Sequence, residues 1–285
     1  MPGVTNFSLE DMSKLATALA TYAASSRTPW IWRKVDSVDD TLFSLFDLDR
    51  MLCVVGIRPP FIALVNGLTG LCPWHFTLTQ EPVLGCAGAS RVLEEILHRK
   101  STVVIQHVHR VSPQVAELAR SLGTLLSPAT VQCNGYLTPP NAVGVPPHVD
   151  QHHTLLLQLS GVKHWQIWKH ADPDRSAPMI TTTQSEINRI SSETPPVLEV
   201  DVVAGDVLFI PRGFVHAAKT SIAHSLHLTF GISDPTAHIA ADLFLRDRTS
   251  DSDTTFSLEG VGVLQQLTER SHVSEIDNAF ISILR

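Results

Sequence analysis

The spacing of apolar and polar residues changes character near Pro128. Before this point, several stretches repeat apolar residues every three to four positions, as along one face of an amphipathic helix. These stretches are 9–19, 37–52, 90–97 and 113–122. Two apolar runs, at 61–65 and 102–106, indicate strands instead. The first 125 residues are therefore predicted to form a mixed, mainly helical region that flanks the rest of the chain.

After Pro128, short apolar runs alternate with turn residues such as Ser160-Gly161 and Pro211-Arg212-Gly213. Short strands without helices between them are typical of a jelly-roll barrel, the double-stranded β-helix of cupins. The predicted fold class is therefore mainly β with flanking helices (α+β), with the barrel core at 126–233. Eight strands are expected, at 130–137, 147–151, 154–160, 163–169, 197–203, 206–210, 214–219 and 225–232.

Two segments do not follow the strand pattern. Residues 171–196 form a polar, Ser/Thr-rich insertion without clear periodicity, which predicts a functional lid or a disordered loop inside the barrel sequence. Helical spacing returns in the C-terminal region, 234–285. The last apolar stripe there packs on its own barrel by default, and a homodimer contact through these helices is the alternative.

Composition excludes several classes of protein. The chain is 44% hydrophobic and 17% charged, which describes an ordinary folded protein, and its formal net charge is -7. No block of basic residues occurs, so direct nucleic-acid binding is not expected. The four cysteines form no C-x-x-C pair, and the N-terminus lacks the pattern of a signal peptide. We therefore expect a cytoplasmic protein, and no apolar run reaches the roughly 20 residues that span a bilayer.

The candidate chemistry centres on Val145-Pro146-Pro147-His148-Val149-Asp150. Along a strand, His148 and Asp150 point to the same face, so an imidazole and a carboxylate can bind one metal ion together. His216, which follows the Pro211-Arg212-Gly213 turn, is the best candidate for a third ligand. Two histidines and one carboxylate form the facial triad of non-haem iron(II) oxygenases. The alternative is an ordinary polar pair at a strand end, because H-x-D alone is a common pattern.

Several motifs together resemble the JmjC-type 2-oxoglutarate oxygenases, in particular their ribosomal-oxygenase branch of arginyl and histidyl hydroxylases. The resemblance covers roughly residues 100–232 and preserves the order and spacing of the motifs. They are Asn134 to Asn141, Pro147-His148-Val149-Asp150, Leu157 to Trp165, Gly205 to His216, and His224 to Thr229.

The resemblance implies roles for individual residues. His148, Asp150 and His216 would bind Fe(II), and Lys163 would pair with the distal carboxylate of the co-substrate 2-oxoglutarate. The alternative for Lys163 is a solvated lysine at a strand end. Cofactor binding is also implied for Asn134, Tyr136 and Ser225. The alternative for Asn134 and Tyr136 is ordinary core packing.

The implied reaction uses O2 and 2-oxoglutarate to hydroxylate an amino-acid side chain, with release of succinate and CO2. The implied substrate is a protein or peptide, such as a ribosomal protein or a ribosomally made peptide. Only 53 residues follow Ile232, too few for a dimerisation region and a complete winged helix. Two alternatives therefore stay open: the same chemistry on a free amino acid or metabolite, and a non-catalytic metal-binding cupin.

Overall fold

The computed structural model describes a large part of the chain. The described residues are 16, 17, 20, 28–33, 42–66, 69–71, 75–77, 85–126, 129–171, 180 and 182–233. Most of the helix predicted at 9–19 lies outside them, as does the whole predicted helical region 234–285 with its possible dimer contact. No helix within the described residues is long and apolar enough to cross a membrane.

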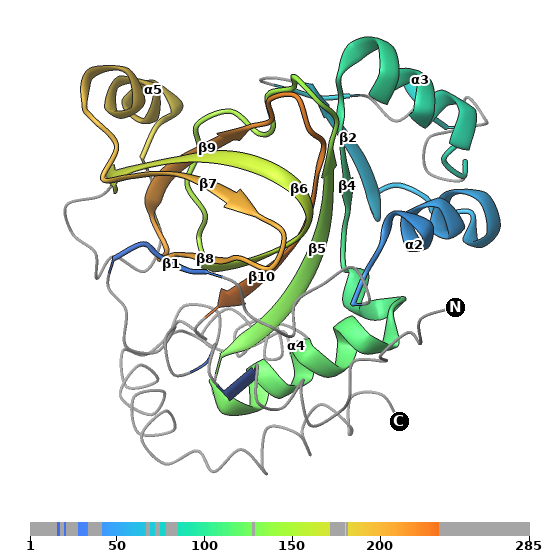
Figure 1. Ribbon diagram of the computed structural model, residues 1–285, viewed down its shortest axis with the longest axis horizontal. Coiled ribbons are helices and arrows are strands. Elements are labelled where there is room, and N and C mark those ends of the chain that lie inside the picture. The colour runs from blue at the N-terminus through green and yellow to red at the C-terminus, as the bar shows by residue number, and fades with distance from the viewer. Residues whose placement is uncertain are drawn as a thin grey trace, which may run out of the picture.

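Strands dominate the described part of the chain (Figure 1). The N-terminal elements are β1 (Trp30–Trp32), α2 (Leu45–Arg50), the π-helical turn η1 (Met51–Val55), β2 (Ile62–Asn66), β3 (Thr69–Gly70), α3 (Ala89–Arg99), β4 (Thr102–Ile105), η3 (Val108–Arg110) and α4 (Pro113–Leu125). The later elements are β5 (Thr130–Thr138), β6 (His153–His170), α5 (Gln184–Glu193), β7 (Leu198–Val203), β8 (Val207–Ile210), β9 (Phe214–Lys219) and β10 (Ser225–Ser233).

Antiparallel pairing organises these strands into the predicted barrel. The main sheet has the order β1-β8-β6-β10-β5-β4-β2-β3, while β7 and β9 pair with β6 away from this path. Figure 1 shows the strongly curved β6 passing from one side of the barrel to the other, with β7 and β9 beside its second half. The structure therefore confirms a mainly β, jelly-roll fold with flanking helices.

The long strand β6 differs from the prediction of two strands at 154–160 and 163–169. The structure has a single strand here, which bends at Gly161 without ending. The bend is possible because Gly161 adopts a positive φ of +71°. A Cβ at this position would lie 1.8 Å from the carbonyl oxygen of His224, so only glycine fits. Before Gly161 the strand pairs with β8 and β10, and after it with β7 and β9. The residue interpreted as a turn is therefore a bend that closes the barrel.

Two other segments differ from the sequence predictions. Residues 147–151 are not a strand, because His148 forms only an isolated bridge with His216. The insertion at 171–196, predicted to be a functional lid or a disordered loop, contains the helix α5, so this part of it is ordered. The Thr183 side chain caps this helix by accepting from the Glu186 backbone N–H, and two isoleucines of the helix are buried beside Trp168 and Val215. Residues 172–179 and 181 of the insertion lie outside the described residues.

The N-terminal region contributes to the same sheet. Strand β4 pairs with β5, and β2 pairs with β4, so these strands extend the barrel sheet. Helix α4 begins as predicted at Ser112-Pro113, where the Ser112 hydroxyl accepts from the Val115 N–H. The helix expected over 37–52 has its N-cap at Ser44, in a capping box with Asp47. Residues 34–41 lie outside the described residues.

Alternating side chains of β6 fill two separate cores. Leu155 and Leu157 are fully buried in the cluster that includes Leu118 and Leu122 of α4. Leu156, between them in the chain, belongs to the second cluster, which also contains Trp165 and lies toward the cavity described below. Burying each leucine stabilises the fold by roughly 1.5–3 kcal/mol. The barrel wall is thus held by apolar packing, and Trp165 belongs both to this packing and to the wall of the cavity.

Candidate metal centre and co-substrate pocket

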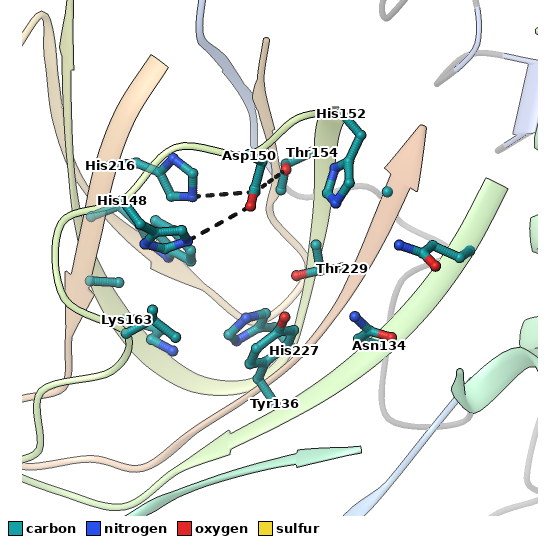
Figure 2. A pocket seen from close by; sticks show the side chains of 15 residues that line it. Asn134, Tyr136, His148, Asp150, His152, Thr154, Lys163, His216, His227 and Thr229 are labelled. Carbon is teal, nitrogen blue, oxygen red and sulfur yellow. Dashed lines mark hydrogen bonds and ion pairs between the residues drawn. The ribbon is translucent and has the colours of Figure 1, made fainter. Parts of the chain in front are cut away.

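The side chains of His148, Asp150 and His216 lie close together (Figure 2). The His216 Nε2 atom is 3.5 Å from Asp150 Oδ2, and the His148 Nε2 atom is 3.9 Å from Asp150 Oδ1. The potential ligand atoms of the three side chains lie within 4.8 Å of one another. One ion can therefore contact all three side chains.

Backbone hydrogen bonds hold the three residues in place. His148 and His216 exchange two bonds, of 3.1 Å and 3.0 Å between N and O atoms, although 68 positions separate them in the chain. The Gly213 N–H also donates to the Asp150 carbonyl oxygen at 3.2 Å, which joins the turn before β9 to the H-x-D segment. The site is thus assembled where the loop before β6 lies along β9.

The hydrogen bonds of both histidines select the tautomer that a metal needs. The Nδ1 atom of His148 is 2.7 Å from the Pro146 carbonyl oxygen, and Nδ1 of His216 is 2.9 Å from the Phe214 carbonyl oxygen. A carbonyl oxygen only accepts, so each Nδ1 carries the proton and each Nε2 offers its lone pair. Thr154 donates its hydroxyl to Asp150 Oδ2 at 2.7 Å and orients that carboxylate.

The protonation states agree with this arrangement. Burial, followed by the neighbouring His216, lowers the pKa of His148 to about 4, so this ring is neutral at pH 7. Burial alone would raise the pKa of Asp150, but its hydrogen bond to His216 and the nearby histidines hold it well below its usual range. Burial likewise opposes protonation of His216, yet Asp150 raises its pKa. A metal would therefore compete with a proton for Nε2 of His216.

A cavity of about 80 Å³ extends from the triad into the barrel. Its walls come mainly from β5, β6 and β10 (Figure 2). The lining residues are Gln132, Asn134, Tyr136, Val145, His148, Asp150, His152, Thr154, Lys163, Trp165, His216, Ala218, His227, Thr229 and Gly231. The cavity therefore combines a potential metal site with many hydrogen-bonding groups.

Lys163 lies inside the barrel and not at a solvated strand end. The residue is only 3% exposed, and its ammonium group donates to the Thr138 hydroxyl at 3.0 Å. Its Nζ atom also lies 5.7 Å from the centre of the Trp165 ring. Among the described residues no carboxylate forms an ion pair with Lys163, and burial lowers its pKa to about 7. An anionic ligand would supply the missing counter-charge.

The three remaining predicted site residues have different surroundings. Tyr136 lines the cavity, and burial raises its pKa to about 12, so its hydroxyl keeps its proton. Asn134 also lines the cavity, but its Oδ1 atom accepts from the His107 N–H at 2.9 Å and so has a structural partner. Ser225 is not among the lining residues, because its hydroxyl is fully buried and accepts from Gln158 at 2.9 Å.

The sequence interpretation missed His227 as a site residue. It lies on β10 directly opposite Tyr136 of β5, and the two rings stack with centroids 4.9 Å apart. His152 lines the same cavity. The period of two along β10 could have placed His227 on one face with Thr229. The pairing register with β5, which brings that face to the cavity, is not visible in the sequence.

A jelly-roll barrel with two histidines and one aspartate around a cavity has the architecture of a metal-binding cupin. Within this class, residues 105–239 match the model of the JmjC domain. The chain therefore carries a JmjC domain, as the sequence motifs had indicated.

Relatives of known name share parts of this region. Ribosomal oxygenase 1 of Gallus gallus is 41% identical over 100 residues, which are 34% of this chain and 16% of that protein. The bifunctional lysine-specific demethylase and histidyl-hydroxylase NO66 of Aedes aegypti is 39% identical over 103 residues, which are 35% of this chain and 15% of that protein. The match thus spans about one sixth of the length of these relatives.

A solved structure supports the fold. The ribosomal oxygenase YcfD of Escherichia coli, in complex with cobalt and 2-oxoglutarate, has a TM-score of 0.51 to this chain at 15% identity. The superposition covers 82% of this chain and 59% of the YcfD chain. At this identity the likeness concerns the fold alone.

Proposed function

We propose that this protein is an Fe(II)- and 2-oxoglutarate-dependent dioxygenase that hydroxylates an amino-acid side chain of a protein or peptide, releasing succinate and CO2. The observation that carries the proposal is one cavity that joins a His-Asp-His cluster to a buried lysine, for which the described part of the chain offers no carboxylate partner. This pairing suits a metal ion together with a co-substrate that bears a second, distal carboxylate.

The residues fit the proposed metal and co-substrate. His148, Asp150 and His216 would hold the iron through two Nε2 atoms and one carboxylate oxygen. When bound, iron and 2-oxoglutarate would together activate O2, whose two oxygen atoms enter the succinate and the hydroxylated substrate. The protein contributes the ligand geometry and the buried Lys163 ammonium for the distal carboxylate, within one cavity.

The relatives support a protein substrate. The names of the Gallus gallus and Escherichia coli proteins identify them as ribosomal oxygenases, and that of the Aedes aegypti protein includes histidyl-hydroxylase activity. A ribosomal protein or a ribosomally made peptide is therefore our proposed substrate for this chain. We also propose a cytoplasmic location. Direct binding of nucleic acid is not part of the proposal, since the net charge is -7 and no basic block occurs.

The first test is release of succinate from 2-oxoglutarate by the purified protein with iron(II), ascorbate and air, without added substrate. We expect slow turnover in the wild type and none in His216→Ala. His164→Ala is the matched control, because this histidine pairs with Asp201 and Glu199 outside the cavity and its loss leaves turnover unchanged.

Binding measurements resolve a negative result. If no succinate forms but cobalt(II) and 2-oxoglutarate bind to the wild type and not to His216→Ala, turnover needs the substrate. If neither binds, the proposal is wrong and the chain is not a 2-oxoglutarate oxygenase. Mass spectrometry of ribosomal proteins and of free amino acids after turnover then shows which class gains one oxygen atom.

A further inference from the structure

His227 is a buried polar side chain whose position calls for a ligand. It is 2% exposed and lines the cavity. Its ring stacks on Tyr136 with an interplanar angle of 4° and meets the edge of Trp165 at a centroid distance of 5.9 Å. Figure 2 shows it between Lys163 and Asn134, across the cavity from the triad. Apolar contacts therefore fix the ring plane without using its nitrogen atoms.

Neither nitrogen of His227 has a hydrogen-bond partner among the described residues. Nδ1 is fully enclosed, so Nε2 is the nitrogen that reaches the cavity. A neutral imidazole has one donor nitrogen and one acceptor nitrogen. An enclosed N–H without a partner is rarer and costlier than an enclosed acceptor. The favoured tautomer therefore places the proton on Nε2, where it faces the cavity as a donor.

Lys163 lies on the same side of the cavity. Both side chains pack on the Trp165 ring, with its centre 5.7 Å from the lysine Nζ and 5.9 Å from the imidazole centroid. Burial, and then the nearby ammonium, lower the pKa of His227 well below its usual value, so the ring adds a neutral donor and not a second cation. One ammonium and one neutral N–H suit a single carboxylate better than two cations would.

We propose that His227 is a co-substrate-binding residue whose Nε2–H donates to the distal carboxylate that Lys163 binds. The inference rests on the proposed function, because it concerns the same 2-oxo acid. It extends the site to β10, so that β6 supplies the charge and β10 supplies a second, directional hydrogen bond. Tyr136 then acts as the surface that holds the imidazole in plane.

The test compares two 2-oxo acids on the whole protein loaded with cobalt(II), which avoids turnover. The first is 2-oxoglutarate, and the second is 2-oxopentanoate, which has the same carbon chain without the distal carboxylate. Dissociation constants are measured by calorimetry for the wild type, His227→Leu and His227→Gln, whose amide N–H can reach the position of Nε2. His164→Leu is the matched control, since that histidine lies outside the cavity.

We expect His227→Leu to weaken 2-oxoglutarate binding by about tenfold or more, as for loss of a hydrogen bond to a charged group. Glutamine restores most of the affinity, while cobalt(II) and 2-oxopentanoate bind all variants alike. If the leucine variant does not fold, His227→Phe keeps the stacked ring without a donor and replaces it in the same comparison.

Two results would overturn the proposed role. Unchanged affinity for 2-oxoglutarate in the leucine or phenylalanine variant removes His227 from the site. An equal loss of affinity for both acids shows that the residue acts on the shared 2-oxo acid end or on the structure. A wild type that binds cobalt(II) but no 2-oxoglutarate contradicts the proposed function itself, and with it this inference.

Discussion

Lys163 is enclosed in a barrel whose described residues offer its ammonium a hydroxyl acceptor and an aromatic ring, but no carboxylate. A buried charge without a counter-charge destabilises the protein until a ligand supplies one. Asp150, by contrast, has Thr154 and His216 within bonding distance. At the scale of residues, the two ends of the cavity thus differ. One end is satisfied by protein groups, and the other is completed by a ligand.

This difference predicts a trade-off between stability and binding at Lys163. Its pKa is about 7 in the folded protein and about 10.5 in a free side chain, so between these values the unfolded chain binds more protons. Stability of the unliganded wild type should therefore rise with pH above 7, by about 2 kcal/mol between pH 6.5 and pH 9. Lys163→Met lacks this contribution, is more stable than the wild type at pH 6.5, and loses affinity for 2-oxoglutarate.

Urea unfolding at the two pH values measures this effect. Lys219→Met is the control, because Lys219 is an exposed lysine on β9. The pH dependence of its stability should match the wild type. If Lys163→Met showed the same rise with pH as the wild type, the lysine would not be the group that titrates.

A glycine in strand β6 and a glycine in helix α4 respond oppositely to replacement by alanine. Gly161 has a positive φ within β6 and faces the His224 carbonyl, so a methyl group has no room there. Gly123 lies in α4, where the nearest atom of the described residues to an added Cβ would belong to the Val131 side chain, at 3.8 Å. At the scale of elements, the same substitution therefore distinguishes a required bend from an ordinary helical position.

We predict that Gly161→Ala lowers the free energy of unfolding by about 3 kcal/mol, through strain at positive φ and displacement of backbone. Gly123→Ala should instead stabilise the protein by about 0.5–1 kcal/mol, because alanine loses less backbone entropy in a helix. Chemical denaturation measures both values, if the free energy of unfolding falls with denaturant concentration at the same slope in each variant as in the wild type. An alanine at 161 that left stability unchanged would contradict the bend assigned to β6.

The barrel is joined to the first described strand by an ion pair between a half-exposed arginine and a buried aspartate. Arg33, next to β1, donates to Asp206 Oδ2 at 2.6 Å and to the Asp201 carbonyl at 2.8 Å. Asp206 is fully buried and also accepts from the Val203 N–H at 3.1 Å. Strand β1 meanwhile pairs with β8. At the scale of the whole molecule, this carboxylate links the N-terminal region to the turn between β7 and β8.

We predict that Asp206→Ala costs about 2–3 kcal/mol, because it leaves the Val203 backbone N–H without its acceptor and removes the charged partner of Arg33. Asp201→Ala is the control: its side chain is exposed and pairs with His164, while its carbonyl acceptor is retained. That variant should lie within about 0.5 kcal/mol of the wild type. Thermal unfolding measures the stability of both variants. Equal losses of stability would show that the contact of Asp206 with Arg33 does not stabilise the fold.

Local patterns in the sequence were sufficient for the class of fold and for much of its outline. Short apolar runs between turn residues predicted the barrel, and Ser112-Pro113 marked the start of α4. The H-x-D spacing and the later His216 indicated residues that the structure brings within 4.8 Å of one another. Such inferences succeed because strand periodicity, turn preference and helix capping depend on residues close together in the chain.

Tertiary structure decided what depends on distant pairing. The bridge between His148 and His216 joins a loop to β9, and the register of β10 on β5 places His227 against Tyr136. No local pattern states which strands will pair or in which register. Whether Lys163 would be solvated or buried likewise depended on closure of the barrel around it. The sequence determined which groups were available, and the closed sheet determined which of them share one cavity, because strand pairing is a property of the whole fold.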